Sequence, residues 1–134
     1  RFGQSAPAVR RAVSLVNAGE LVGMFPEGGV AQGARSAVRG GAIKEGVCTI
    51  AVETRSPVIP VVVLGTEKLN RVGPWLPFRR GKVWIAFGDE VKPRERSASR
   101  RADRKEMAQR LRNEFVRTYQ RLLNETGLKD DDVP

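Results

Sequence analysis

Histidine is absent from the 134 residues, so no imidazole of this chain can act as general base, nucleophile or metal ligand. Cysteine occurs once, at Cys48, which excludes an internal disulfide and is typical of a reducing compartment. Cys48 lies near the apolar face of a predicted helix, and we interpret it as a core residue rather than a reactive thiol. No apolar run approaches the roughly 18 residues of a membrane-spanning helix. We expect no metal site in these residues.

Aromatic residues make up only 6% of the chain and are not interleaved with basic ones, which argues against a stacking surface for single-stranded nucleic acid. Basic residues are abundant, and the net charge is +9. Thirteen basic and five acidic residues lie between positions 71 and 112. Such a field attracts phosphates of lipids, nucleic acids or nucleotide-bearing substrates. A solvated surface that maintains solubility explains the same charge equally well.

Apolar residues spaced three and four positions apart predict three helices. The first begins with Ser5 as N-cap and ends at Gly19, and the second covers residues 43–54. The third begins at Asp103, in a sequence similar to a capping box, and ends at Gly127. The apolar stripe of this third helix consists of Met107, Leu111, Phe115, Tyr119 and Leu122.

Three short runs predict strands, at residues 21–25, 58–64 and 82–88, and the first is interpreted as buried. The second run is continuous and rich in β-branched residues, which is typical of a strand covered on both faces. The order of helices and strands predicts an α/β fold with a central, mostly parallel sheet flanked by helices. We expect a single domain over residues 1–134, with a flexible tail at 128–134.

Phe25-Pro-Glu-Gly28 stands where the first predicted strand meets a glycine-rich loop at residues 28–41. In α/β sheets, ligands bind beyond the carboxyl ends of strands, so Glu27 is placed at the mouth of a pocket. Gly28 and Gly29 allow backbone N–H groups to approach an anion closely. Three cations follow that can clamp a phosphate, namely Arg35, Arg39 and Lys44. An ordinary turn with solvated arginines is the alternative reading.

The order of these motifs resembles the glycerol-3-phosphate and lysophosphatidic acid acyltransferase family. Phe25-Pro-Glu-Gly28 is similar to the third sequence block of that family. Lys44-Glu-Gly46 is similar to its Lys-x-Gly element, and Val58-Ile-Pro-Val61 to its fourth block. The resemblance covers about residues 1–69 and implies a glycerolipid-acyltransferase-like fold that is incomplete at the N-terminus.

The resemblance implies that Glu27 and Gly28 bind the glycerol-phosphate end of the acyl acceptor. The family continues with Thr-Arg-Ser after this glycine, whereas here Ala34-Arg35-Ser36 follows after about five inserted residues. Arg35 is therefore the candidate phosphate contact, with Arg39 as its substitute. The remaining candidates implied by the resemblance are Lys44 and Arg1, the latter as the arginine of the second block.

The family's catalytic block is His-x4-Asp, in which the histidine acts as general base and the aspartate orients it. This chain contains no histidine, so it holds no catalytic residue of that kind. We expect the block upstream, in a part that precedes these residues, and we expect this fragment alone to be inactive. A sheet without its first strands exposes apolar surface, which predicts poor solubility.

The resemblance thus predicts acyl transfer from acyl-CoA or acyl-carrier protein to a lysophospholipid or glycerol phosphate in phospholipid biosynthesis. No cofactor is implied beyond the acyl donor. The expected location is the cytoplasmic face of a membrane, peripheral or anchored through an N-terminal segment, with an anionic membrane surface as partner and no nucleic acid. The alternative is a non-catalytic basic module that binds anionic membrane or nucleic acid.

Overall fold

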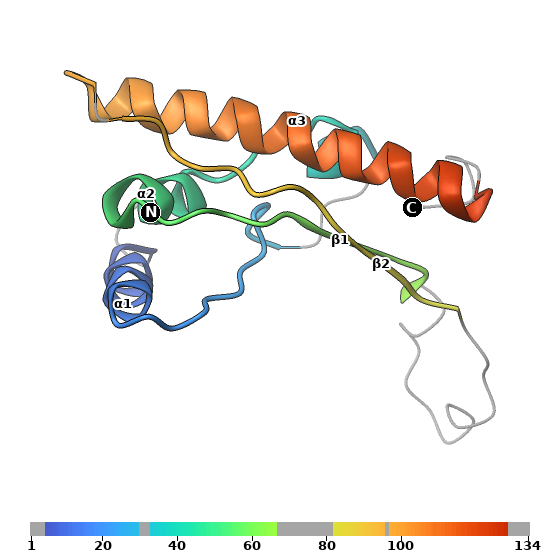
Figure 1. The fold of residues 1–134 in the computed structure, drawn as a ribbon, viewed down its shortest axis with the longest axis horizontal. Coiled ribbons are helices and arrows are strands. Elements are labelled where there is room, and N and C mark those ends of the chain that lie inside the picture. The colour runs from blue at the N-terminus through green and yellow to red at the C-terminus, as the bar shows by residue number, and fades with distance from the viewer. Residues whose placement is uncertain (1–4, 30–32, 67–81, 96, 129–134) are drawn as a thin grey trace.

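The computed structural model describes residues 5–29, 33–66, 82–95 and 97–128 (Figure 1). Its longest element, helix α3, runs along one face of a two-stranded ribbon formed by β1 and β2. Helix α2 lies between α3 and α1. The chain thus combines helices and strands, as predicted. Within the described ranges, none of the helices combines the length and apolarity needed to span a bilayer.

The two N-terminal helices agree with the predicted periodicity. Helix α1 covers Ser5–Asn17, and Gly19 follows it in the left-handed conformation with φ +85°. Helix α2 covers Glu45–Thr54. It buries its apolar face, which consists of Val47, Cys48, Ile50 and Ala51.

Helix α3 covers Arg100–Thr126 and begins three residues before the predicted start at Asp103. Ser99 is the N-cap, because its hydroxyl accepts a hydrogen bond from the N–H of Ala102 at 3.3 Å. The helix ends at Gly127, as predicted, with φ +70°. The predicted apolar stripe is buried along its whole length: Met107, Leu111, Phe115, Tyr119 and Leu122.

Strand β1, Val61–Leu64, pairs with β2, Trp84–Phe87, in antiparallel register. The described residues therefore show an antiparallel pair, and they do not show the expected parallel sheet. An isolated bridge between Val58 and Val91 extends the pairing beyond Pro60. Because proline lacks an N–H group, it interrupts the ladder, and the strand is shorter than the predicted 58–64.

The apolar run at residues 21–25 forms no strand, contrary to the prediction. Its side chains are largely exposed, Leu21 at 94% and Phe25 at 85%. A strand needs a neighbouring backbone to satisfy its N–H and C=O groups. No strand in the described part of the chain pairs with these residues, so they form no strand and stay largely exposed.

The core lies between α3 and one face of the ribbon. Val62 and Leu64 are buried there against the stripe of α3, whereas Val61 and Val63 on the opposite face are 42% and 45% exposed. The prediction that this run is covered on both faces is therefore wrong for the described residues. Of the predicted tail, Leu128 packs against the core, and residues 129–134 lie outside the described ranges.

Candidate functional site

Glu27 connects the Phe-Pro-Glu-Gly motif to a turn nine residues further along the chain. Its Oε1 accepts a hydrogen bond from the hydroxyl of Ser36 at 2.9 Å and another from the N–H of Ala37 at 2.5 Å. The motif itself is a tight turn, in which the N–H of Gly28 donates to the carbonyl of Phe25 at 3.1 Å. Gly28 has φ +72°, a conformation that favours glycine. The carboxylate is therefore engaged within the protein.

The glycine-rich loop folds into two consecutive 3₁₀ turns, Gly33–Arg35 and Ala37–Arg39. Gly41 closes the second turn, and its N–H donates to the carbonyl of Ser36 at 2.8 Å. A Cβ at Gly41 would lie 2.0 Å from the carbonyl oxygen of Arg35, so only glycine fits there. In spite of the inserted residues, the loop thus returns Ser36 to Glu27.

Lys44 lies beside the motif at the start of α2. Its N–H donates to the carbonyl of Pro26 at 2.8 Å, which joins the motif backbone to the beginning of the helix. Its side chain crosses Gly28, where an added Cβ would lie 3.3 Å from Cγ and 3.4 Å from Cε of the lysine. Lys44 is exposed, so an ammonium group lies in solvent next to the glycine turn.

The remaining predicted site residues differ in their surroundings. Arg35 is exposed, and it directly precedes the residue that binds Glu27. Arg39 is half-buried at the end of the second 3₁₀ turn. Arg1 lies outside the described residues. The structure thus brings Glu27, Gly28, Ser36 and Lys44 together and attaches Arg35 to the same turn.

Ser36 and Gly41 are two residues of this site that the sequence reasoning did not single out. A signal for Ser36 is present in the sequence, since it follows Arg35 in the displaced Ala-Arg-Ser block. Burial of its side chain (8% exposed) and the bond to Glu27 depend on how the loop folds. Nothing in the sequence distinguishes Gly41 from the other glycines of the same loop.

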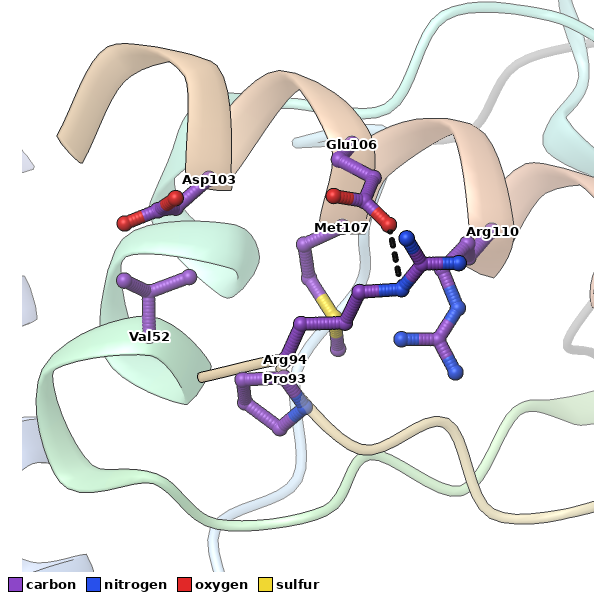
Figure 2. A pocket seen from close by; sticks show the side chains of 7 residues that line it. All are labelled: Val52, Pro93, Arg94, Asp103, Glu106, Met107 and Arg110. Carbon is purple, nitrogen blue, oxygen red and sulfur yellow. Dashed lines mark ion pairs between the residues drawn. The ribbon is translucent and has the colours of Figure 1, made fainter. Parts of the chain in front are cut away.

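A small pocket lies elsewhere, between α2, α3 and the segment that precedes α3 (Figure 2). It holds about one water molecule, which is too little for a substrate. An ion pair of 2.8 Å between Arg94 and Glu106 lies at this pocket. Its lining includes none of the residues around Glu27. In the described part of the chain, no three His, Cys, Asp or Glu residues gather as metal ligands would.

Comparison with known proteins bears on the half of the chain that carries Glu27. Residues 1–64 match the family model described as Acyltransferase. Over 65 residues the chain is 37% identical to 1-acyl-sn-glycerol-3-phosphate acyltransferase BAT2, chloroplastic, of Brassica napus. That alignment covers 48% of this chain and 18% of the relative's length. No solved structure matches the chain.

Residues 1–64 are therefore similar to an acyltransferase domain. The resemblance of this part of the chain to glycerol-3-phosphate and lysophosphatidic acid acyltransferases is confirmed. The Phe-Pro-Glu-Gly turn, Lys44 and the loop that returns to Glu27 all lie within the matched stretch.

Proposed function

We propose that the protein transfers an acyl chain from acyl-CoA or acyl-carrier protein to a lysophospholipid or glycerol phosphate in glycerolipid synthesis. The similarity of residues 1–64 to the acyltransferase family supports acyl transfer in general. In this proposal the described residues supply the acceptor-phosphate site. The observation that carries it is the cluster around Glu27, which gathers a glycine turn, the exposed cation Lys44 and Ser36, the residue that directly follows the exposed Arg35.

The chemistry of this surface suits a phosphate monoester. Glycine at position 28 leaves the turn open to a close approach by an anion. Lys44 is the N-cap of α2 and its side chain lies beside Gly28, so its ammonium and the positive end of the α2 dipole both favour negative charge near the motif. The guanidinium of Arg35 is planar and can donate two parallel hydrogen bonds to phosphate oxygens. Arg39 and Arg1 are further candidates for this role.

In this proposal the general base is supplied from outside these 134 residues, which contain no histidine. In the proposed reaction a His-Asp pair removes the proton from the acceptor hydroxyl, whose oxygen attacks the thioester carbonyl, and the thiol of the donor leaves. The residues described here bind and orient the acceptor for that attack. By themselves they are expected to be inactive, and the proposal needs no cofactor besides the acyl donor.

We place the reaction at the cytoplasmic face of a membrane, where lysophospholipid acceptors reside. The basic excess between residues 71 and 112 supports contact with anionic headgroups. The exposed apolar run at residues 21–25 would join β1 in a larger, mostly parallel sheet together with further strands. Its apolar composition and exposure are the observations behind that arrangement.

Arg35→Gln in the full-length protein tests the acceptor site. We expect the KM for lysophosphatidic acid to rise about tenfold, because charged hydrogen bonds to phosphate are worth about 1.5–3 kcal/mol. The KM for acyl-CoA should change less than twofold. Arg101→Gln is the matched control, since Arg101 is an exposed arginine on α3.

Other outcomes of this assay are equally informative. A larger effect of Arg39→Gln than of Arg35→Gln would move the phosphate contact to Arg39. A wild-type protein that is inactive with several acceptors, yet binds anionic vesicles tightly, would favour the non-catalytic basic module instead.

A further inference from the structure

The geometry points to Ser36 as a positioning residue, which holds Arg35 for the acceptor phosphate through its hydrogen bond to Glu27. This inference rests on the proposed function. It assigns Glu27 a role within the protein: its carboxylate organises the loop, and the loop presents the cation.

Two hydrogen bonds join Ser36 and Ala37 to Glu27, and we call this pair of bonds the latch. One carboxylate oxygen, Oε1 of Glu27, accepts from both the Ser36 hydroxyl and the Ala37 N–H. Ala37 is the first residue of the second 3₁₀ turn, where a backbone N–H lacks a partner within the turn. The side chain of Ser36 makes no cap to its own turn and donates to Glu27 instead. Glu27 therefore caps the turn from outside.

Burial indicates that this latch is a built feature rather than a chance surface contact. Ser36 is 8% exposed and Ala37 is 1% exposed, whereas the neighbouring Arg35 is exposed. A buried hydroxyl that loses its acceptor is costly, so the bond holds the loop in one arrangement. The N–H of Gly41 closes the same turn by donating to the Ser36 carbonyl.

Arg35 needs such an anchor because it is the last residue of a 3₁₀ turn that is only three residues long. An arginine side chain loses about 2 kcal/mol of rotamer entropy when it is fixed, so its backbone must be placed in advance for tight phosphate binding. Ser36 is the adjacent residue, and its bond to Glu27 fixes that backbone relative to Gly28 and Lys44. Ser36 should then influence acceptor binding only by positioning Arg35.

The test compares variants of the full-length enzyme, with lysophosphatidic acid as the acceptor. Ser36→Ala should raise the acceptor KM about fivefold to tenfold, with kcat and the donor KM changed less than twofold. In an Arg35→Gln background the same substitution should add less than twofold, because its effect is transmitted by Arg35. Ser14→Ala, which removes an exposed hydroxyl of α1 that bonds the Arg10 carbonyl, should change nothing.

Glu27→Gln provides a second, independent comparison, which also serves if Ser36→Ala fails to fold. Glutamine keeps an oxygen that accepts from both Ser36 and Ala37, so the acceptor KM should stay within about threefold of wild type. Glu27→Ala removes both hydrogen bonds of the latch and should raise the acceptor KM at least tenfold. Trypsin should also cleave after Arg35 and Arg39 faster in Ser36→Ala than in the wild type or Glu27→Gln.

Several results would overturn the inference. One is an active enzyme in which Ser36→Ala leaves the acceptor KM unchanged. Another is that Ser36→Ala raises the acceptor KM as much in the Arg35→Gln background as in the wild type. If Glu27→Gln is as damaging as Glu27→Ala, the charge of Glu27 acts on the acceptor directly and the latch is not its role. A wild type that transfers no acyl chain overturns the proposed function itself, which is a distinguishable outcome.

Discussion

Cys48 illustrates how burial decides the chemistry of a single residue. It lies on α2 with 1% of its surface exposed, which confirms the prediction from the sequence that it is a core residue. Burial raises the pKa of its thiol from the ordinary value of 9.0 to about 11, and the charge of Glu45 adds to the rise while Arg104 opposes it. A thiol with so high a pKa is a poor nucleophile at neutral pH.

The raised pKa predicts that stability falls in alkaline solution. Between pH 9 and pH 11 the unfolded thiol has lost its proton while the folded one keeps it, so the free energy of unfolding decreases as pH rises. The loss over this window should be on the order of 2 kcal/mol, at 1.36 kcal/mol per pKa unit. Urea titrations at several pH values measure it. Cys48→Ala should show a correspondingly shallower slope, and equal slopes would refute the prediction.

At the scale of one element, polar side chains of α3 form hydrogen bonds with the backbone at the end of β2 and just after it. Oε1 of Glu114 accepts from the Asp89 N–H at 2.9 Å, and Arg121 donates to the Phe87 carbonyl at 2.6 Å. A Cβ at Gly88 would lie 2.5 Å from Thr118 Oγ1, which shows how closely this backbone approaches the helix. Part of the basic face of α3 therefore has a structural use.

Glu114 is the residue of this contact whose loss should cost most. It is 8% exposed, and it also pairs with Arg117 at 2.6 Å. Glu114→Ala leaves the Asp89 N–H and the Thr118 hydroxyl without their acceptor, so the free energy of unfolding should fall by about 2 kcal/mol. Glu125→Ala, at an exposed position of the same helix, should change it by less than about 0.5 kcal/mol. Urea denaturation distinguishes the two, and equal effects would contradict this account.

At the scale of the whole molecule, one face of the ribbon is covered and the other is open. Apolar side chains stand on the open face at 42–65% exposure: Val61, Val63, Ile85 and Phe87. Contiguous exposed apolar surface of this kind marks a contact surface or a liability to aggregation. The exposed run at residues 21–25 adds to it.

This surface predicts that the 134-residue chain self-associates when it is produced alone. Light scattering and sedimentation should show oligomers at micromolar concentration, and the double substitution Ile85→Lys with Phe87→Lys should increase the monomer fraction several-fold by placing charge on the open face. Val62→Lys, at a position 2% exposed, should unfold the chain instead. A monodisperse wild-type chain that unfolds cooperatively would contradict the prediction.

The sequence alone determined those features that depend on neighbouring residues. Helix periodicity, the glycine ends at Gly19 and Gly127, and the burial of the α3 stripe were all predicted, because capping and amphipathicity are local properties. The family was also readable, since its motifs follow one another in order along the chain.

Only the tertiary structure decided what depends on distant partners. A short apolar run does not reveal its neighbour, so sequence reasoning could not foresee that β1 and β2 pair antiparallel or that residues 21–25 stay exposed. The Glu27–Ser36 bond depends on how the inserted loop folds back, and Gly41 is required there by a backbone contact that no local pattern encodes. Contacts between residues far apart in sequence are determined by packing of the whole chain, and packing also decides what each candidate residue can touch.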